Sequence, residues 1–118
     1  MVANTSLADA ALDRVFTALG DATRRSILAR LSAPDGCELT LGELAEPYEM
    51  SRQAVAKHLD VLERAGLVDR HPDCRVTRHR FTAEPLGHAA EWVERYRRHW
   101  EQQFDALSRF LESPDQES

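Results

Sequence analysis

The sequence predicts a mostly α-helical fold with one small β-hairpin. Apolar residues recur at spacings of three and four over most of the chain, which is the period of an amphipathic helix. Between residues 67 and 82 the pattern changes to short β-like segments, and from residue 84 to 112 the helical period returns. Two short helices followed by a hairpin form a winged helix-turn-helix. We expect the helix-turn-helix at about residues 40–65 and the wing at about 67–82.

Length and composition are those of one domain. The chain has 118 residues, within the range of roughly 100–200 per domain, and 42% of them are hydrophobic, enough for one core. It contains no run of about 18 apolar residues and no basic or apolar segment at its N-terminus, so we expect neither a membrane span nor a secretory signal. Cys37 and Cys74 are too few for a disulfide framework. We therefore expect residues 1–118 to form a single cytoplasmic domain.

The first two helices are delimited by residues that favour helix ends. The first helix is expected at about residues 7–19, and Gly20 would end it in a left-handed conformation. Asp21 then caps the second helix. The apolar positions of that helix are Ile27, Leu28 and Leu31.

The third and fourth helices also begin with capping residues. Thr40 and Glu43 fit a capping box, in which each side chain accepts a hydrogen bond from the other residue's backbone amide. Ser51 is the N-cap candidate of the fourth helix, and Gly66 is expected to end it. The hairpin turn is expected at residues 71–74. One face of the fourth helix carries the apolar residues Val55, Leu59 and Leu62.

The last helix, expected at about residues 84–112, is long and strongly apolar on one side. Its residues 93, 100 and 107 repeat every seven positions, and it holds five of the chain's eight aromatic residues. The core of one small domain cannot cover this apolar face. We therefore expect two copies to pair through the first and last helices. Alternatively, the aromatic residues line a ligand pocket between the subunits. The expected dimer interface is Leu12, Val15, Phe16, Leu19, Val93, Tyr96, Trp100, Phe104 and Leu107.

The charge is unevenly distributed along the chain. The net charge is −5, but residues 50–82 contain seven basic and four acidic side chains. The segments on either side each contain four basic and eight acidic side chains. A basic segment in an acidic protein is compatible with a polyanionic partner, or with an ordinary solvated surface.

The polar face of the fourth helix favours double-stranded DNA as that partner. Lys and Arg pair with guanine, Gln pairs with adenine, and Ala can pack on a thymine methyl group. Ser51 and the free amides behind it can hold a phosphate. Arginines on the hairpin would reach the neighbouring backbone or minor groove. The candidate DNA-binding residues are Ser51, Arg52, Gln53, Ala54, Lys57, His58, Arg75, Arg78 and Arg80.

Two other classes of function compete with DNA binding. The first is a winged-helix module that binds protein and not DNA. The exposed residues Arg52, Gln53 and Lys57 favour DNA over a protein surface. An enzyme is not expected, because the sequence contains no nucleophile motif, no Gly-rich phosphate loop and no clustered acid–base pair.

Three segments resemble the arsenical-resistance-type (ArsR) repressors. Residues 19–28 (LGDATRRSIL) look like the second-helix signature of that family, and residues 44–68 are similar to its helix-turn-helix. Residues 91–100 (EWVERYRRHW) look like the final helix of one subgroup. The resemblance implies a homodimeric repressor of its own or neighbouring genes, which pairs through its first and last helices. It also implies that the helix after Ser51 enters the major groove of a palindromic operator.

The signal that would release such a repressor is open. Many relatives sense metals through cysteines on the third helix, where this sequence has none. His88 and Glu91 could form a zinc site with His99 of a second copy, or they are surface residues. Cys37 and Cys74 could respond to oxidation, or they are simple exposed thiols. We expect no metal and no cofactor; the small-molecule effector is not identified by the sequence, and a metal- or redox-responsive repressor is the alternative.

Overall fold

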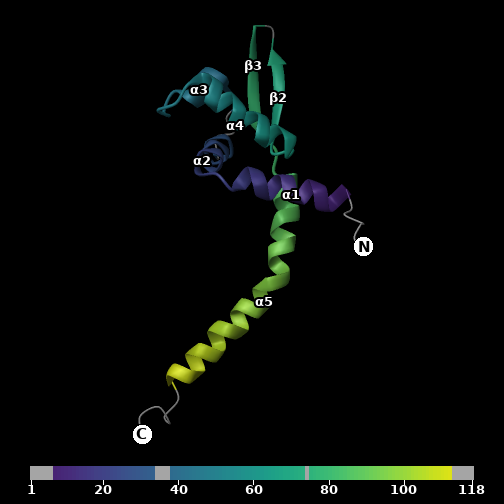
Figure 1. Cartoon of the computed structure of the whole chain (residues 1–118), viewed down its shortest axis with the longest axis vertical. Helices are drawn as coiled ribbons and strands as arrows, with labels where there is room; N and C mark the ends of the chain where they lie inside the picture. Colours follow the sequence, from purple (N-terminus) through teal and green to yellow (C-terminus); the bar gives the residue numbers. More distant parts are fainter. Residues whose placement is uncertain (1–6, 34–37, 74, 113–118) are drawn as a thin grey trace.

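The computed structural model describes residues 7–33, 38–73 and 75–112 (Figure 1). Within these ranges the chain forms a mostly helical winged helix-turn-helix fold with one antiparallel sheet. None of the helices in the described ranges has the length and apolarity needed to cross a membrane. The elements are α1 (Leu7–Leu19), α2 (Ala22–Leu31), β1 (Leu39–Thr40), α3 (Leu41–Ala45), α4 (Arg52–Arg64), β2 (Val68–Asp73), β3 (Val76–Phe81) and α5 (Glu84–Glu112).

The molecule consists of a head and a stem. The head contains all elements from α1 to β3 together with the first turns of α5, and the wing hairpin projects from it (Figure 1). The stem is the rest of α5, residues 91–112, which leaves the head as a single helix and makes the molecule 73 Å long. Every residue of the stem is exposed.

One hydrophobic core holds the head together. The apolar faces predicted for α2 and α4 are buried in it, as expected from their three- and four-residue spacing. α5 contributes only Ala89, so the core closes without the stem. The buried core residues are Val15, Ala18, Ile27, Leu28, Leu31, Leu44, Ala45, Val55, Leu59, Leu62, Ala65, Leu67, Val68 and Ala89.

The predicted helix starts are confirmed. Asp21 accepts hydrogen bonds from the backbone amides of Thr23 and Arg24, at 2.8 and 3.2 Å. Thr40 and Glu43 form both hydrogen bonds of the capping box. The side chain of Ser51 accepts from the amide of the third residue after it. Each cap satisfies amides that the first helical turn leaves without a partner.

α4 ends as the sequence predicts, at a left-handed glycine. Gly66 has a φ of 77° and donates to the carbonyl of Glu63, and Leu67 donates to the carbonyl of Leu62. These two bonds form a Schellman motif, which favours glycine because a β-carbon is strained at positive φ.

α1 ends differently from the prediction. Gly66 is the only glycine with positive φ in the described ranges, so the left-handed conformation expected at Gly20 is wrong. Arginines at the start of α2 hold the end of α1 instead. Arg24 donates to the carbonyls of Thr17 and Ala18, and Arg25 donates to the carbonyl of Leu19. The guanidinium groups thus satisfy carbonyls that a helix C-terminus leaves free.

The sheet has one strand more than predicted, in the order β1-β3-β2. β1 is only two residues long and pairs with β3, so no period-2 pattern could reveal it. The turn position is also corrected: Pro72 lies within β2 opposite Thr77, so the chain reverses between Asp73 and Val76 rather than over residues 71–74. β2 is an edge strand, where a residue without an N–H group is tolerated.

Candidate nucleic-acid interface

The start of α4 presents polar side chains on the surface of the head. Gln53 and Lys57 are exposed, as are Ser51 and Arg52, while Ala54 is half-buried. The opposite side of α4 packs in the core and fixes the rotation of the helix. The structure therefore leaves four of these five predicted residues exposed on the surface formed by the first two turns of α4.

Arg52 reaches from this face toward α3. A β-carbon added at Gly42 would lie 3.2 Å from Nη2 of Arg52, so the guanidinium rests against the first turn of α3. Arg52 also lines a cavity of about 480 Å³ together with Val76 and Thr77 of the wing. The start of α4, the second helix of the helix-turn-helix and called the recognition helix below, thus lines the same cavity as the outer part of the wing.

His58 does not join the exposed set. Its Nδ1 lies 3.3 Å from Nη1 of Arg24 and 4.0 Å from Oδ1 of Asp21, so the ring is directed at α2. The pKa of Asp21 is held below its ordinary value by the backbone hydrogen bond from Arg24, then that from Thr23, and by the nearby charges of His58 and Arg24, against opposing desolvation. His58 therefore links α4 to α2 and lies apart from the exposed candidate residues.

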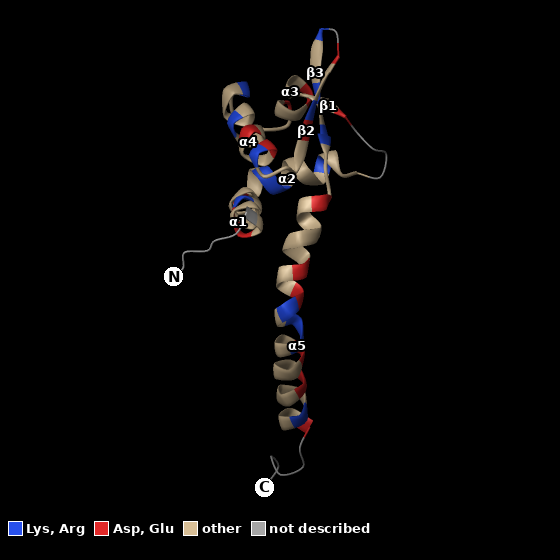
Figure 2. Cartoon of the chain, turned by 90° about the vertical axis from the view of Figure 1, so that its right-hand side faces the viewer, with Lys and Arg blue, Asp and Glu red and all other residues tan. Residues whose placement is uncertain are grey.

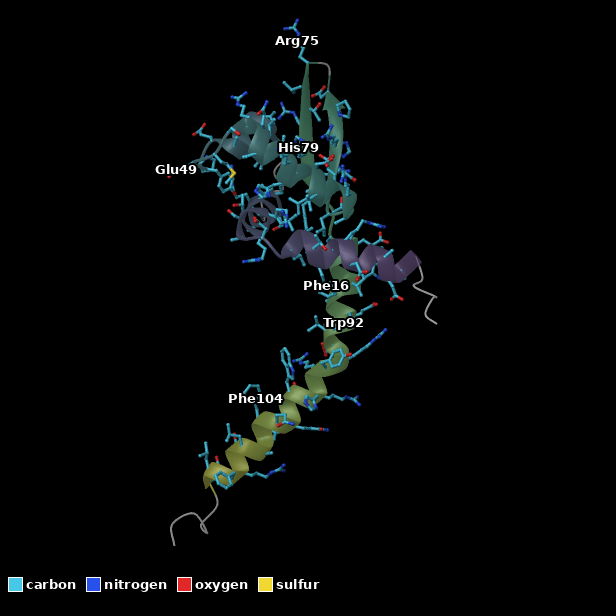
Figure 3. All side chains as sticks on the ribbon, in the orientation of Figure 1. Phe16, Glu49, Arg75, His79, Trp92 and Phe104 are labelled. Carbon is cyan, nitrogen blue, oxygen red and sulfur yellow. The ribbon has the colours of Figure 1, made fainter. Side chains whose placement is uncertain are left out.

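The three wing arginines differ in their surroundings. Arg75 is exposed at the tip of the hairpin (Figure 3). Arg78 is half-buried with Nε 3.9 Å from a carboxylate oxygen of Asp73. Arg80 is exposed near the base of the wing, opposite Asp69 in the register. The tip arginine is therefore the one that extends farthest from the head.

The face expected to pair two copies of the chain is present on α1 and α5. Phe16 contacts Trp92 edge to face with ring centroids 5.5 Å apart (Figure 3). Leu12 and Leu19 are half-buried. Val15, which we expected on this face, does not lie on it: only 2% of the residue is exposed, because it packs in the core of its own chain. The predicted residues that remain exposed are Phe16, Val93, Tyr96, Trp100, Phe104 and Leu107.

Two of the candidate sensor residues, His88 and Glu91, lie on α5. In the ranges that the structure describes, no group of three or more His, Cys, Asp or Glu side chains could hold an ion. His88 and Glu91 line a cavity of about 390 Å³ between α1 and α5, next to Trp92. Cys37 and Cys74 lie outside the described residues.

Charged residues that the sequence left unassigned prove to hold the helices together. Besides Arg24 and Arg25, Arg30 of α2 donates to the carbonyls of Glu43 and Leu44 at the end of α3. Arginines on a solvated helix face are typical of many proteins, so only the clustering of three in one ten-residue helix could have signalled this role.

Comparison with known proteins agrees with this geometry. A helix-turn-helix domain family matches residues 19–71. The uncharacterized HTH-type transcriptional regulator YuzN of Bacillus subtilis is 46% identical over 89 residues, which cover 70% of this chain and 95% of YuzN. The transcriptional repressor SdpR of the same organism is 28% identical over 82 residues, 70% of this chain and 88% of SdpR. The structure of an ArsR-like transcriptional regulator from Rhodococcus sp. RHA1 has a TM-score of 0.70 and 35% identity, covering 87% of this chain and 92% of that one.

Fold, exposed recognition helix and relatives together define a DNA-binding transcriptional regulator of the winged helix-turn-helix class, not an enzyme. Within that class, the chain belongs to the ArsR-type family.

Proposed function

We propose that the protein is a homodimeric repressor of its own or neighbouring genes that binds a palindromic operator. The observation that carries the proposal is the exposed start of α4 beside the outer part of the wing. In this arrangement one surface offers a helix to the major groove and a hairpin to the adjacent backbone. The name of the relative SdpR supports repression rather than activation.

The exposed residues divide into base readers and backbone contacts. Gln53 and Lys57 project freely and suit adenine and guanine edges. Arg52 rests against α3, so we assign it to a phosphate, as we do Arg75 at the wing tip. Ser51 already caps α4, and it presents the free amides behind it to the DNA backbone.

The stem supports the homodimer. Figure 2 shows charged residues along one side of α5 and other residues along the opposite side. At about 100° per residue, Tyr96, Trp100 and Phe104 lie on one side of α5, and all three are exposed in the single chain. A second copy is the partner that presents the same apolar stripe, and a two-fold pair would carry two recognition helices to half-sites about 34–36 Å apart. We place this single-domain protein in the cytoplasm, with its DNA.

Gel-shift and footprinting assays on the DNA upstream of the protein's own gene test the proposal. Lys57→Ala should weaken binding to that DNA by about 1–3 kcal/mol and reduce discrimination against random DNA, because a base contact is lost. Arg52→Ala should weaken binding to both DNAs alike. Arg98→Ala, which removes the same charge from the exposed stem, is the control and should leave both affinities unchanged. No retardation of either DNA at low salt would overturn the proposal.

A further inference from the structure

A carboxylate in the last turn of α4 contacts both strands of the wing. Oε2 of Glu63 accepts a hydrogen bond from Nε of Arg70 on β2, at 2.7 Å. The same oxygen lies 3.8 Å from Nε2 of His79 on β3. Arg70 and His79 are direct partners in the register of the hairpin. The hydrogen bond to Glu63, and then the charge of Glu63, raise the pKa of Arg70, so this guanidinium stays charged.

The contact extends to the third strand through His79. This side chain is only 5% exposed, and its Nδ1 lies 3.1 Å from the carbonyl oxygen of Leu39 on β1. A carbonyl can only accept, so Nδ1 carries the proton and donates. One side chain of the recognition helix therefore touches a cross-strand pair that is itself joined to the remaining strand of the sheet.

Because this contact lies well below the wing tip, a small change of angle at the contact moves the tip by a larger distance. Three register pairs, ending at Asp73 and Val76, lie between the Arg70–His79 pair and the tip. At about 3.3 Å per residue, the hairpin extends roughly 10 Å beyond the contact. A rotation of about 10° at the contact would therefore move the tip by roughly 2 Å, enough to break a hydrogen bond between Arg75 and a phosphate.

We propose that Glu63 is a positioning residue for DNA binding: it holds the wing at a fixed angle to the recognition helix, so that the wing tip and the start of α4 meet the duplex together. The inference rests on the proposed function only in assuming that both elements contact DNA. Glu63 itself lies in the last turn of α4, at the opposite end of the helix from Arg52 and Gln53, the residues proposed to meet DNA.

A matched pair of variants isolates this role from charge. Glu63→Gln and Asp60→Asn each remove one negative charge from α4, but Asp60 pairs with Arg64 of the same helix, at 2.9 Å. Less negative charge favours DNA equally in both variants. We expect Asp60→Asn to bind as well as or better than wild type and Glu63→Gln to bind about 5-fold more weakly than Asp60→Asn, a coupling within the usual range for contacting residues. Glu63→Asp keeps the charge but is one methylene shorter, and it should also weaken binding.

The decisive measurement is the effect of Arg75→Ala in two backgrounds. The probes are a duplex from the upstream region of the protein's own gene and a random-sequence duplex of equal length. In the wild-type background Arg75→Ala should lower affinity about 10-fold and reduce the slope of log affinity against log salt by about 0.9. In the Glu63→Gln or Glu63→Asp background it should change affinity less than about 2-fold, because the tip no longer meets the backbone.

Three outcomes would overturn the proposal. The first is an Arg75→Ala penalty equal in all backgrounds, which would make Glu63 a structural residue only. The second is a loss of affinity that matches the unfolded fraction from thermal unfolding of the Glu63 variants. The third is that Arg75→Ala does not lower affinity in the wild-type background while Lys57→Ala still does. In that case α4 would bind DNA without the wing. Failure of the wild type to bind either duplex would instead contradict the proposed function itself.

Discussion

The head and the stem both contain amphipathic helices, but the apolar face is buried within the chain in the head and exposed in the stem. In the head, the apolar face of α4 meets other faces of the same chain, and Leu62 is completely buried. In the stem, an equally regular face leaves Trp100 58% exposed and Phe104 67% exposed. Helical periodicity therefore predicts that a face will be covered, and the partner can come from the same chain or from another copy.

The largest effect is expected from a charge placed on the stem. Trp100→Glu should dissociate the homodimer, because pairing would bury two carboxylates near the two-fold axis without partners. The head should remain folded, since its core closes without the stem. Sedimentation at micromolar concentration should give about twice 13.4 kDa for the wild type and 13.4 kDa for the variant. Operator affinity should fall with the dimer, because one half-site retains only part of the binding energy.

Gln102→Glu is the control for this variant. It adds the same charge two residues away, on the side of α5 roughly opposite Trp100 at ~100° per residue. It should sediment as the wild type does. A wild-type protein of monomer mass would contradict the dimer and, with it, the palindromic operator.

A truncation in each region sharpens the comparison. Leu62→Ala should lower the free energy of unfolding by about 2–5 kcal/mol, since it leaves a cavity in a fully buried site. Phe104→Ala should leave the unfolding of dilute, monomeric protein unchanged and raise only the dissociation constant of the dimer. Urea unfolding of dilute protein and sedimentation measure the two quantities. Equal destabilisation of the dilute monomer by both changes would show that the stem is part of the core of its own chain.

Helix starts and the buried faces of the head could be predicted because they depend on neighbours in sequence. The N-cap at Ser51 can be recognised from the next three residues, and the apolar stripe of α4 can be recognised from about two helical turns. The exposed polar side of α4 followed from that stripe, because whatever lies opposite a buried face must be accessible. A helical wheel could therefore place Gln53 and Lys57 on the exposed side of α4 without knowledge of the other helices.

What the sequence could not reveal depends on contacts between distant segments. β1 exists only because Leu39 meets His79, forty residues later in the chain. His58 turns toward α2 because Asp21 and Arg24 are there. Val15 is buried because α1 packs against α2 and α4 as well as against α5. Helical periodicity alone does not tell which apolar residues of α1 face which of these neighbours.

Within the head, the wing arginines should contribute in order of their distance from the base. Arg75→Ala should reduce the slope of log affinity against log salt by about 0.9, the loss of one phosphate contact. Arg78→Ala should reduce it less, because Asp73 already lies near this guanidinium. Arg80→Ala should have the smallest effect, because Arg80 lies next to Phe81 and Val68, the residue pair at the base of the hairpin. Gel shifts over a range of salt concentrations measure the slopes; the reverse order would place the DNA along the base of the wing.

The smallest effect is expected from acid, and it should act on the head rather than on the stem. The pKa values of Asp21 and Glu43 are lowered from 3.8 and 4.5, in both cases chiefly by backbone hydrogen bonds of the helix caps. A carboxylate with a lowered pKa in the folded state stabilises the fold above its unfolded pKa. That contribution is lost as the pH falls from about 5 through the folded value.

Asp21→Asn separates this titration from the cap itself. Asparagine still accepts the hydrogen bonds of Thr23 and Arg24 but has no proton to gain, so the variant should lose less stability than the wild type between about pH 5 and pH 3. Asp21→Ala loses both the cap and the charge, so it should be the least stable of the three near neutral pH and also less acid-sensitive than the wild type. Urea midpoints followed by the helical circular dichroism signal measure these differences. The same acid response in Asp21→Asn and in the wild type would show that the carboxylate at the start of α2 contributes only as a neutral hydrogen-bond acceptor, and the acid sensitivity of the head would then have to come from Glu43 or from other groups.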